Sequence, residues 1–399
     1  MSISERINTS ISAAELERRW ALVRRDMADQ DIDALVMQNT NDWLGGYVKW
    51  FTDVPANNGY PRTVIFYQSD WMTVIEMGPF GSERDFDGKD SLHRGVGKVR
   101  HTPSFLSIDY TEGYDADLTL DEIKRRGCVN VGLVNPGGIA HAFASRLQQG
   151  LAGQCRLVDA TRFVDRHKAI KSKEEIGLIR RTASLQDQVF ARVVEAVRPG
   201  LRDIDITSLA QCEGQKLGSE QGIFLGASAR VGTISPFMPR HLQQRTLNRG
   251  DHLSLLIEIN GPGGFYTEIA RTIVLGHASN QLLDGFENVR EAQVHTLGQI
   301  KPGVSCRDVA QAHDDYMRAR GLPPETRLYA HGQGYDMVER PLIRADESMC
   351  FEEGMCLAVH PGYETPEIFA VICDNYMVGA QGPGECLHKT EKKVFEIPV

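Results

Sequence analysis

The second half of the chain contains an internal repeat. The segment 197–201, Val-Arg-Pro-Gly-Leu, reappears as Ile-Lys-Pro-Gly-Val at 300–304. The same offset of 103 residues (302 minus 199) carries Gly218 onto Gly321. Each copy is a Pro-Gly turn, an amphipathic helix and a glycine stop. Two copies of one turn–helix unit predict a pseudo-symmetric domain with a cleft between its two halves.

The first half of the chain predicts a separate α/β domain. Ser12 and Glu15 form a capping-box pattern ahead of a stretch with apolar residues at helical spacing. Short apolar runs predict strands at 34–37, 63–67, 72–77 and 129–134, with a helical segment at 118–126 before the last strand. The segment 40–62 holds tryptophans, glycines and prolines, which favours a loop with local aromatic packing. Mixed helices and strands indicate an α/β (α+β) fold class.

A basic connector at 166–173 separates the two halves. Ser172 within it is placed to cap a following helix. At 399 residues the chain is long for one core, so two domains are the default. We therefore predict an N-terminal α/β domain at 1–165 and a second domain at 166–399.

Composition excludes several classes of function. The formal net charge of -9, without any Lys/Arg run, argues against a nucleic-acid partner. The first six residues lack the apolar core of a signal peptide, and no stretch reads as a membrane span. The eight cysteines are scattered without a C-x-x-C pair, which is typical of reduced thiols. We expect a cytoplasmic protein.

The first candidate site lies in a predicted hairpin. The strand at 249–260 is almost wholly apolar until Glu258, and after a glycine-rich turn the return strand at 265–274 carries Glu268. Carboxylates in buried strands are costly unless they are paired, bind a metal or act in catalysis. A joint catalytic role and an ion pair of Glu268 with Arg271 are both open.

Three further segments place polar residues in apolar surroundings. His331 lies in the glycine-rich loop 330–335, and His360 ends an apolar strand at 354–363. Cys373 and Asp374 interrupt a third apolar strand. Four such segments in one domain predict a single convergent site.

Neighbouring residues are candidates for substrate binding. Tyr266, Arg271 and Tyr335 flank the predicted cluster. The guanidinium fork of Arg271 suits a carboxylate, because it can donate two parallel hydrogen bonds. Packing or an ion pair is the alternative for each of the three.

Taken in order, these motifs resemble the creatinase, aminopeptidase P and prolidase family. The matching positions are Gly250-Asp251, the return strand from Glu268 to Thr272, His331 to Gly334, Gly354 to Pro361, Asp374, and the opening Lys171 to Ile176. The resemblance implies a pita-bread catalytic domain behind a smaller α/β domain. It also implies a homodimer, in which the smaller domain can reach the neighbouring subunit's cleft.

The chain departs from this pattern at the metal ligands. Metal-dependent members of the family hold two ions with Asp, Asp, His, Glu and Glu. The resemblance implies that the first Asp falls near Leu256 to Glu258, that the second becomes Glu268, and that the His is kept as His331. It also implies that the two Glu ligands become His360 and Cys373, and that a second family histidine becomes Val338. Histidine cannot bridge two cations as a carboxylate does. The dinuclear dipeptidase site is therefore not expected here.

Two interpretations of the cluster remain. In the favoured one the site works without a cofactor, as in creatinase: Glu268 activates water or attacks carbon, with Glu258 as a second catalytic carboxyl. His331 shuttles a proton, and His360 orients the substrate. The resemblance implies that creatinase's own site residues are not reproduced, because Ala270, His360 and Cys373 stand at their positions. The position of creatinase's proton-relay histidine falls near Pro239, and His241 lies two residues away. The substrate is then not creatine, and His241 and Cys373 are further substrate-binding candidates.

In the other interpretation the cluster binds one divalent transition metal. Glu268, His331, His360 and Cys373 would supply a mixed N, S and O ligand set suited to zinc or iron. The leading function hypothesis follows from the first, cofactor-free interpretation: a hydrolase that cleaves an amide or amidine C–N bond in a small, carboxylate-bearing nitrogen compound. The alternatives are a metal-dependent lyase, an Xaa-Pro-type peptidase with a remodelled mononuclear site, and a non-catalytic binding module.

Overall fold

The chain is described by a computed structural model that covers residues 5–39, 41 and 43–399. Residues 1–4, at the start of the segment tested for a signal peptide, and Thr40 and Asp42 of the predicted aromatic loop lie outside the described residues. The chain divides into two compact units. One comprises Ser10–Lys168, and the other comprises Ala169–Val399 together with the residues up to Thr9.

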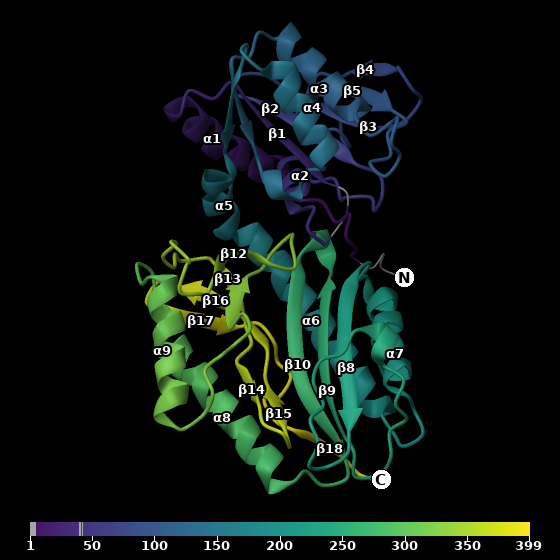
Figure 1. The fold of residues 1–399 in the computed structure, drawn as a ribbon, viewed down its shortest axis with the longest axis vertical. Helices are drawn as coiled ribbons and strands as arrows, with labels where there is room; N and C mark the ends of the chain where they lie inside the picture. Colours follow the sequence, from purple (N-terminus) through teal and green to yellow (C-terminus); the bar gives the residue numbers. More distant parts are fainter. Residues whose placement is uncertain (1–4, 40, 42) are drawn as a thin grey trace. The chain divides into compact units, whose positions relative to one another are not determined.

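The unit Ser10–Lys168 is a seven-stranded mixed sheet with helices. The strand order is β4-β5-β3-β2-β1-β6-β7. The strands are β1 (Ala34–Asn39), β2 (Arg62–Tyr67), β3 (Met72–Met77), β4 (Glu83–Asp85), β5 (Val96–Thr102), β6 (Asn130–Leu133) and β7 (Arg156–Asp159). The helices are α1 (Ala13–Asp29), α2 (Gly46–Thr52), α3 (Tyr114–Arg125), α4 (His141–Leu151) and α5 (Thr161–Ala169). The predicted α/β fold class of this half is confirmed (Figure 1).

Helix α1 follows its sequence pattern closely. The side chain of Ser12 accepts a hydrogen bond from the backbone N–H of Glu15 and caps the helix. The apolar stripe Leu16, Trp20, Val23 and Met27 is buried. The prediction of a loop at 40–62 was wrong in part, because Gly46–Thr52 forms helix α2. Its residues Val48, Trp50 and Phe51 are buried, so the aromatic packing that predicted a loop stabilises a short helix instead.

The unit that begins at Ala169 holds two helix pairs and two main sheets. One sheet has the order β18-β10-β9-β8, the second β12-β11-β13-β16-β17, and β14 pairs with β15. The strands are β8 (Gly222–Ala229), β9 (His252–Asn260), β10 (Tyr266–Leu275), β11 (Ala330–Gly332), β12 (Glu339–Leu342), β13 (Cys356–Val359), β14 (Gly362–Glu364), β15 (Phe369–Val371), β16 (Asp374–Gly379), β17 (Gly382–Cys386) and β18 (Phe395–Ile397). The helices are α6 (Lys173–Ala196), α7 (Asp203–Leu217), α8 (Asn280–Leu297) and α9 (Cys306–Ala319).

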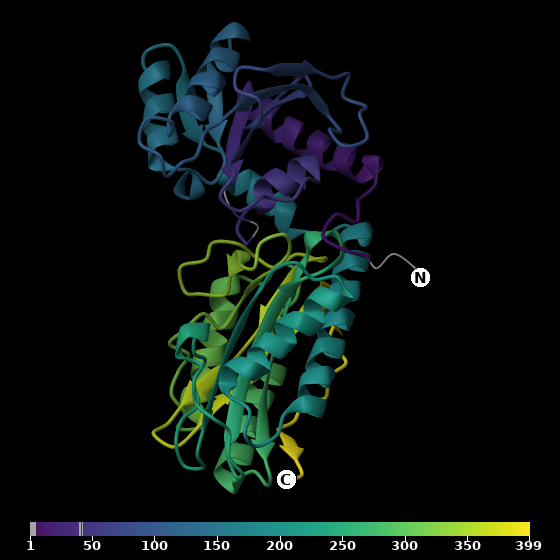
Figure 2. The ribbon, with the colours of Figure 1, turned by 90° about the vertical axis from the view of Figure 1, so that its right-hand side faces the viewer.

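The predicted repeat is confirmed in this unit. The turn at Pro199-Gly200 precedes α7, which ends at Gly218 in the left-handed region (φ 117°). The turn at 302–303 precedes α9, which is followed by Gly321 with φ 70°. Figures 1 and 2 show α6 and α7 along β8–β10, and α8 and α9 beside the other strands. Each half of the unit is therefore one helix pair against one sheet.

Alternate strand residues face the helices. Leu253, Leu255, Ile257 and Ile259 of β9 pack with α6 and α7 in one apolar core. Leu357 and Val359 of β13 pack with α9 in a second core. Because side chains alternate along a strand, the intervening residues of both sheets share the opposite, inner face. No helix within the described residues is long and apolar enough to cross a membrane.

Candidate active site

Hairpin pairing brings two carboxyl groups together. Glu258 on β9 lies directly opposite Glu268 on β10 in the antiparallel register. Residues directly opposite each other project to the same face, with Cβ atoms about 4.5–5.5 Å apart. The pair Leu256 and Ala270 shares this face, while Ile257 faces the helix-side core. Glu258 is thus the carboxylate of β9 that faces the site.

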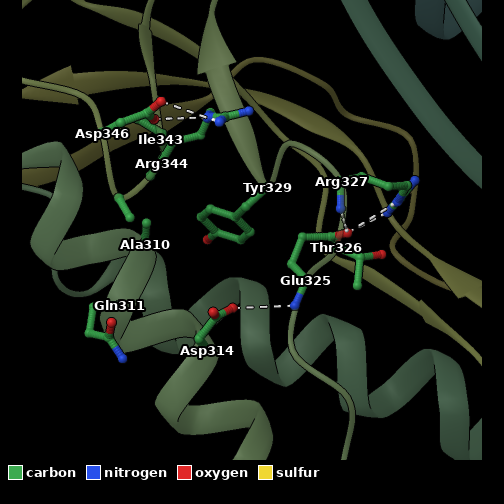
Figure 3. A pocket seen from close by; sticks show the side chains of 11 residues that line it. Ala310, Gln311, Asp314, Glu325, Thr326, Arg327, Tyr329, Ile343, Arg344 and Asp346 are labelled. Carbon is green, nitrogen blue, oxygen red and sulfur yellow. Dashed lines mark hydrogen bonds and ion pairs between the residues drawn. The ribbon is translucent and has the colours of Figure 1, made fainter.

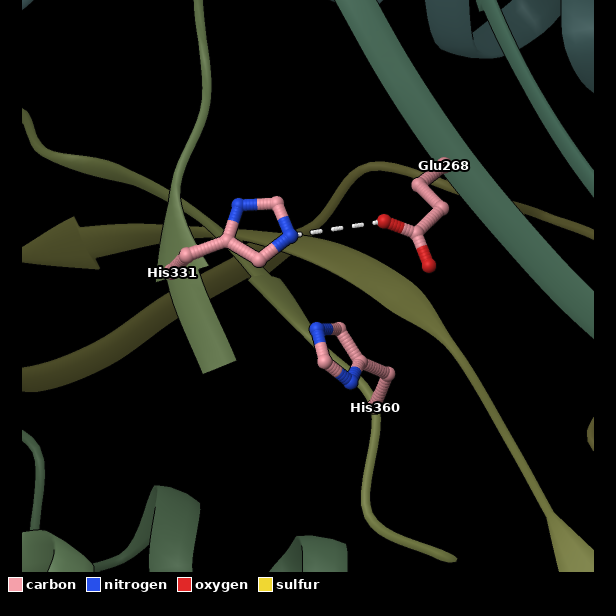
Figure 4. Close-up of side chains that lie close together, drawn as sticks. All are labelled: Glu268, His331 and His360. Atoms are coloured by element: carbon pink, nitrogen blue, oxygen red, sulfur yellow. Dashed lines mark ion pairs between the residues drawn. The ribbon is translucent and has the colours of Figure 1, made fainter. Parts of the chain in front are cut away.

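Two histidines complete a cluster on the inner face. His331 lies on β11, and His360 follows β13. Glu268, His331 and His360 each offer a ligand atom, and these atoms lie within 4.8 Å of one another (Figure 4). The Nε2 atom of His331 is 3.5 Å from Oε2 of Glu268, and the two imidazole centroids are 5.2 Å apart.

Backbone contacts fix how His331 presents its ring. The Nδ1 atom lies 2.9 Å from the carbonyl oxygen of Gly332, which can only accept, so Nδ1–H donates. Nε2 then faces the Glu268 carboxylate, and a proton on Nε2 or a shared cation makes this contact attractive. Gly332 is required here, because a Cβ atom would lie 2.5 Å from the carbonyl oxygen of Arg340.

The two facing carboxyl groups differ in their electrostatics. Burial, followed by the charge of Glu268, raises the pKa of Glu258 well above its usual value. Burial also raises the pKa of Glu268, but the His360 and His331 imidazoles outweigh it and lower this pKa to about 2. Burial lowers the pKa of His360 to about 4. At neutral pH the site therefore favours an ionised Glu268 beside a protonated Glu258 and a neutral His360.

Sequence reasoning missed an amide network that links the backbone of Glu268 to the carboxyl group of Glu258. The backbone N–H of Glu268 donates to Oδ1 of Asn375 at 2.7 Å. Nδ2 of Asn375 donates to Oε1 of Gln333 at 2.7 Å, and Nε2 of Gln333 donates to Oε1 of Glu258 at 2.6 Å. Because the backbone N–H of Glu268 can only donate, it fixes the orientation of the Asn375 amide and, through it, that of the Gln333 amide. The available signal was Gln333 inside the H-G-x-G segment and Asn375 inside an apolar strand.

The same network reaches a buried histidine. Nε2 of His388 lies 3.2 Å from Oδ1 of Asn375, and Nδ1 lies 3.4 Å from Asp187. Asp187 also accepts from the backbone N–H groups of Lys389 and Thr390. These contacts tie the inner face of β16 to the segment that follows β17.

Cys373 lies next to the cluster but outside its ligand group. Its thiol donates to the carbonyl oxygen of Glu268 at 3.6 Å. Burial, followed by the charge of Glu268, raises the pKa of the Cys373 thiol well above its usual value. It packs with Leu256, Ala270 and Ala358 in a small apolar cluster. The structure therefore gives Cys373 a packing role and leaves three residues that could hold an ion.

The structure gives Arg271 another role than substrate binding. Arg271 and Asp374 are fully buried, and Nη2 of Arg271 lies 2.6 Å from Oδ1 of Asp374. The other donors go to the carbonyl oxygens of Ala270, Cys373, Thr390 and Glu391. All five guanidinium protons have protein acceptors. The ion pair considered between Glu268 and Arg271 is therefore wrong, because the two residues face opposite sides of β10.

The remaining predicted residues are spread out. Tyr266 is buried on the face of β10 that carries Glu268. Tyr335 is buried and stacks on Phe265, with ring centroids 4.1 Å apart. His241 is exposed on the turn Arg240–Leu242 and does not belong to the ligand group of the cluster.

A surface pocket of about 520 Å³ lies beside α9 (Figure 3). Its charged rim is paired internally: Arg344 with Asp346 and Arg327 with Glu325. Glu268, His331 and His360 do not line this pocket. The three cluster residues thus lie outside the lining of this pocket, whose rim includes Arg327.

Comparison with known proteins shows the family. The model of metallopeptidase family M24 matches residues 177–380, about half of the chain. The chain belongs to this family. It is 26% identical over 343 residues to the hydrolase/peptidase y4tL of Sinorhizobium fredii, which covers 80% of each chain. It is 25% identical over 398 residues to a creatinase of Bacillus sp., which covers 91% of this chain and 87% of the relative.

Solved structures show the same fold. The X-Pro aminopeptidase of Thermotoga maritima superposes with a TM-score of 0.77 at 17% identity, covering 95% of this chain and 99% of that one. The Xaa-Pro dipeptidase of Bacillus anthracis gives 0.75 at 18% identity, covering 96% and 100%. The unit after Ala169 therefore has the pita-bread fold that the sequence predicted.

Proposed function

We propose that this chain is a hydrolase that cleaves a C–N bond of a small substrate, with Glu268 and Glu258 as paired catalytic carboxyl groups and His331 and His360 beside them. One observation carries the proposal: Glu258 lies opposite Glu268 in the hairpin register, and the Glu268 carboxylate lies beside His331 and His360. Membership in a family whose relatives include a creatinase and dipeptidases supports hydrolysis.

The facing carboxyl groups suit a division of labour. Two neighbouring carboxyl groups whose environments push their pKa values apart can serve as base and acid. Glu268, which is ionised at neutral pH, takes a proton from water as the water oxygen attacks the substrate carbon. The C–N bond then breaks, and the departing nitrogen takes a proton from Glu258. The proton on Glu268 then passes to the facing Glu258, which restores both groups, so water supplies the oxygen of the acid product and the proton of the amine.

The histidines assist at fixed positions. Nε2 of His331 lies 3.5 Å from Oε2 of Glu268, so a proton on Nε2 can neutralise developing charge or pass between carboxylate and substrate. His360 is neutral at neutral pH and can accept a hydrogen bond from the substrate. The amide network of Gln333 and Asn375 holds the carboxyl group of Glu258 and the backbone of Glu268.

A second candidate function uses the same residues with one divalent ion. The donor set fits, since two imidazoles and a carboxylate within 4.8 Å of one another suit zinc or iron. The hydrogen bond from Nδ1 of His331 leaves Nε2 available as a ligand atom. A metal bound by Glu268, His331 and His360 would acidify a bound water. Glu258 would remain the proton donor to the leaving nitrogen.

The proposal is tested by release of amine from a substrate panel. The panel comprises N-acyl amino acids, cyclic amidines, guanidino acids and Xaa-Pro dipeptides, and the readout is new primary or secondary amine. With the best substrate, we expect Glu268→Gln to lower kcat by at least about a hundredfold, the scale of general acid–base catalysis. Glu258→Gln should remove the alkaline limb of the pH–rate profile, because its amide cannot lose a proton.

The control is Glu352→Gln, an exposed carboxyl outside the cluster. Unchanged turnover in Glu268→Gln would exclude Glu268 as the base. An unchanged alkaline limb in Glu258→Gln would assign the acid to another residue.

A further inference from the structure

A different arginine from the predicted one borders the cluster. Because the donors of Arg271 are all used, it cannot take an anionic substrate group. Arg327 lies in the segment before β11, two residues from Tyr329, whose carbonyl oxygen accepts the backbone N–H of His360 at 3.0 Å. Arg327 is thus connected through the backbone to the strand end that carries His360.

Close contact places the Arg327 guanidinium beside the histidine segment. A Cβ atom built on Gly362 would lie 2.6 Å from Nη2 of Arg327, so a glycine is needed for the guanidinium to approach this closely. Gly362 stands two residues after His360. Burial is the main cause of the lowered pKa of His360, and the charge of Arg327 is a smaller one, which agrees with this proximity.

Arg327 retains hydrogen-bonding capacity. Its Nε and Nη2 atoms donate to the two carboxylate oxygens of Glu325 at 3.2 and 3.1 Å. The side chain of Glu325 is buried and also accepts the backbone N–H of Gly362, so it holds the guanidinium in one orientation. Within the described part of the chain, Nη1 of Arg327 donates to no protein acceptor, and the side chain is 40% exposed. Two N–H donors are therefore available to a ligand.

An apolar wall runs from Arg327 back to the carboxyl groups. The Cζ atom of Arg327 lies 5.6 Å from the ring centroid of Phe369, which meets the ring of Phe237 edge to face at 5.1 Å. Phe237 is half-buried and packs on the small cluster formed by Leu256, Ala270, Ala358 and Cys373. That cluster lies on the inner face with Glu268. The catalytic cluster is thus bordered by an aromatic pair that ends at an oriented cation.

We propose that Arg327 anchors a carboxylate of the substrate and that Phe237 and Phe369 hold an apolar or aromatic body between this carboxylate and Glu268. The inference rests on the proposed function and narrows its substrate class to small carboxylic acids with an apolar part. An orienting acid behind the guanidinium is what a bidentate or end-on carboxylate contact requires. Glu325 acts here as a positioning residue for Arg327.

The test measures binding, not turnover, so it stands apart from the test of the proposed hydrolase. Phenylacetate and the neutral analogue phenylethanol are titrated against the full chain by ligand-detected NMR. Wild-type protein should bind phenylacetate at least about tenfold more tightly than phenylethanol, since a hydrogen bond between charged groups contributes a binding free energy of that size. Arg327→Gln should abolish the preference while leaving phenylethanol binding within about twofold.

Two variants guard against misinterpretation. Arg344→Gln removes the other arginine of the neighbouring pocket, which pairs with Asp346, and should keep the preference. Arg327→Lys retains the charge beside the buried Glu325 if Arg327→Gln unfolds, and should weaken phenylacetate binding without abolishing it. Each titration is repeated after dialysis against a chelator.

Several outcomes would overturn the inference. One is equal affinity of the wild type for both ligands, or no binding of either. Another is a preference that survives in Arg327→Gln, and a third is a preference that disappears on chelation, because the carboxylate would then bind an ion. If turnover fails on every panel substrate while the Arg327-dependent preference holds, the proposed reaction is lost but the carboxylate site remains.

Discussion

At the scale of single residues, position determines what a carboxyl group can do. Glu258 and Glu268 have identical side chains on paired strands, yet their pKa values shift in opposite directions. The difference comes from their partners: an uncharged amide, Gln333, contacts Glu258, whereas two imidazoles lie beside Glu268. Sequence spacing could place both carboxyl groups on one hairpin. It could not assign their roles, because those depend on neighbours from distant segments.

Asp115 provides a test of buried carboxyl energetics away from the site. It is fully buried on α3, and burial raises its pKa to about 6. A raised pKa adds stability at low pH that is lost as pH rises through the folded-state value. We expect the free energy of unfolding of wild type to fall, relative to Asp115→Asn, by about 3 kcal/mol between roughly pH 4 and pH 8.

Urea unfolding of both proteins at several pH values measures this difference. The matched control is Asp346→Asn at an exposed position. The free energy of unfolding of this variant, relative to wild type, should change much less with pH. A pH-independent difference between wild type and Asp115→Asn would contradict a raised pKa at Asp115.

At the scale of elements, strand alternation explains which residues meet. Inner-face positions of β10, β13 and β16 bring Glu268, Ala358 and Asn375 to one surface, and helix-side positions build the cores. The sequence predicts this alternation for Arg271, because a residue three positions after Glu268 on one strand faces the opposite side of the sheet. The pairing of β11 with β13 was not readable, since it joins segments whose order in the sheet depends on tertiary packing.

The Arg271–Asp374 pair makes a prediction about stability. The pair ties β10 to β16 and to the segment at 390–391. Removing one partner of a buried pair leaves an uncompensated charge, which costs about 3–5 kcal/mol. We expect Arg271→Met to lower the free energy of unfolding by that amount, measured by urea denaturation.

The matched control for this element is Arg344→Met, which breaks an exposed arginine–aspartate pair and should leave stability nearly unchanged. A stable Arg271→Met protein with weakened substrate binding would instead restore Arg271 as a substrate residue.

At the scale of the whole molecule, the repeat in the sequence predicted the two-halved fold of the unit that begins at Ala169. Two Pro-Gly turns in register specified two helix–sheet halves, and the structure has them. Of the four metal ligands that the sequence predicts, Glu268, His331 and His360 form a group among the described residues, and Cys373 is not part of it. The proposed carboxylate anchor Arg327 lies outside every sequence motif, and its place follows from tertiary contacts with Gly362, Glu325 and Phe369.

The most direct test of the central claim is turnover after complete removal of metal. The best panel substrate is assayed with protein whose metal content is measured by elemental mass spectrometry before and after chelation. The account predicts unchanged kcat below about a tenth of an equivalent of any transition metal, and loss of activity in Glu268→Gln. Activity that disappears on chelation and returns with one equivalent of zinc or iron would contradict it, and would establish the mononuclear alternative at Glu268, His331 and His360.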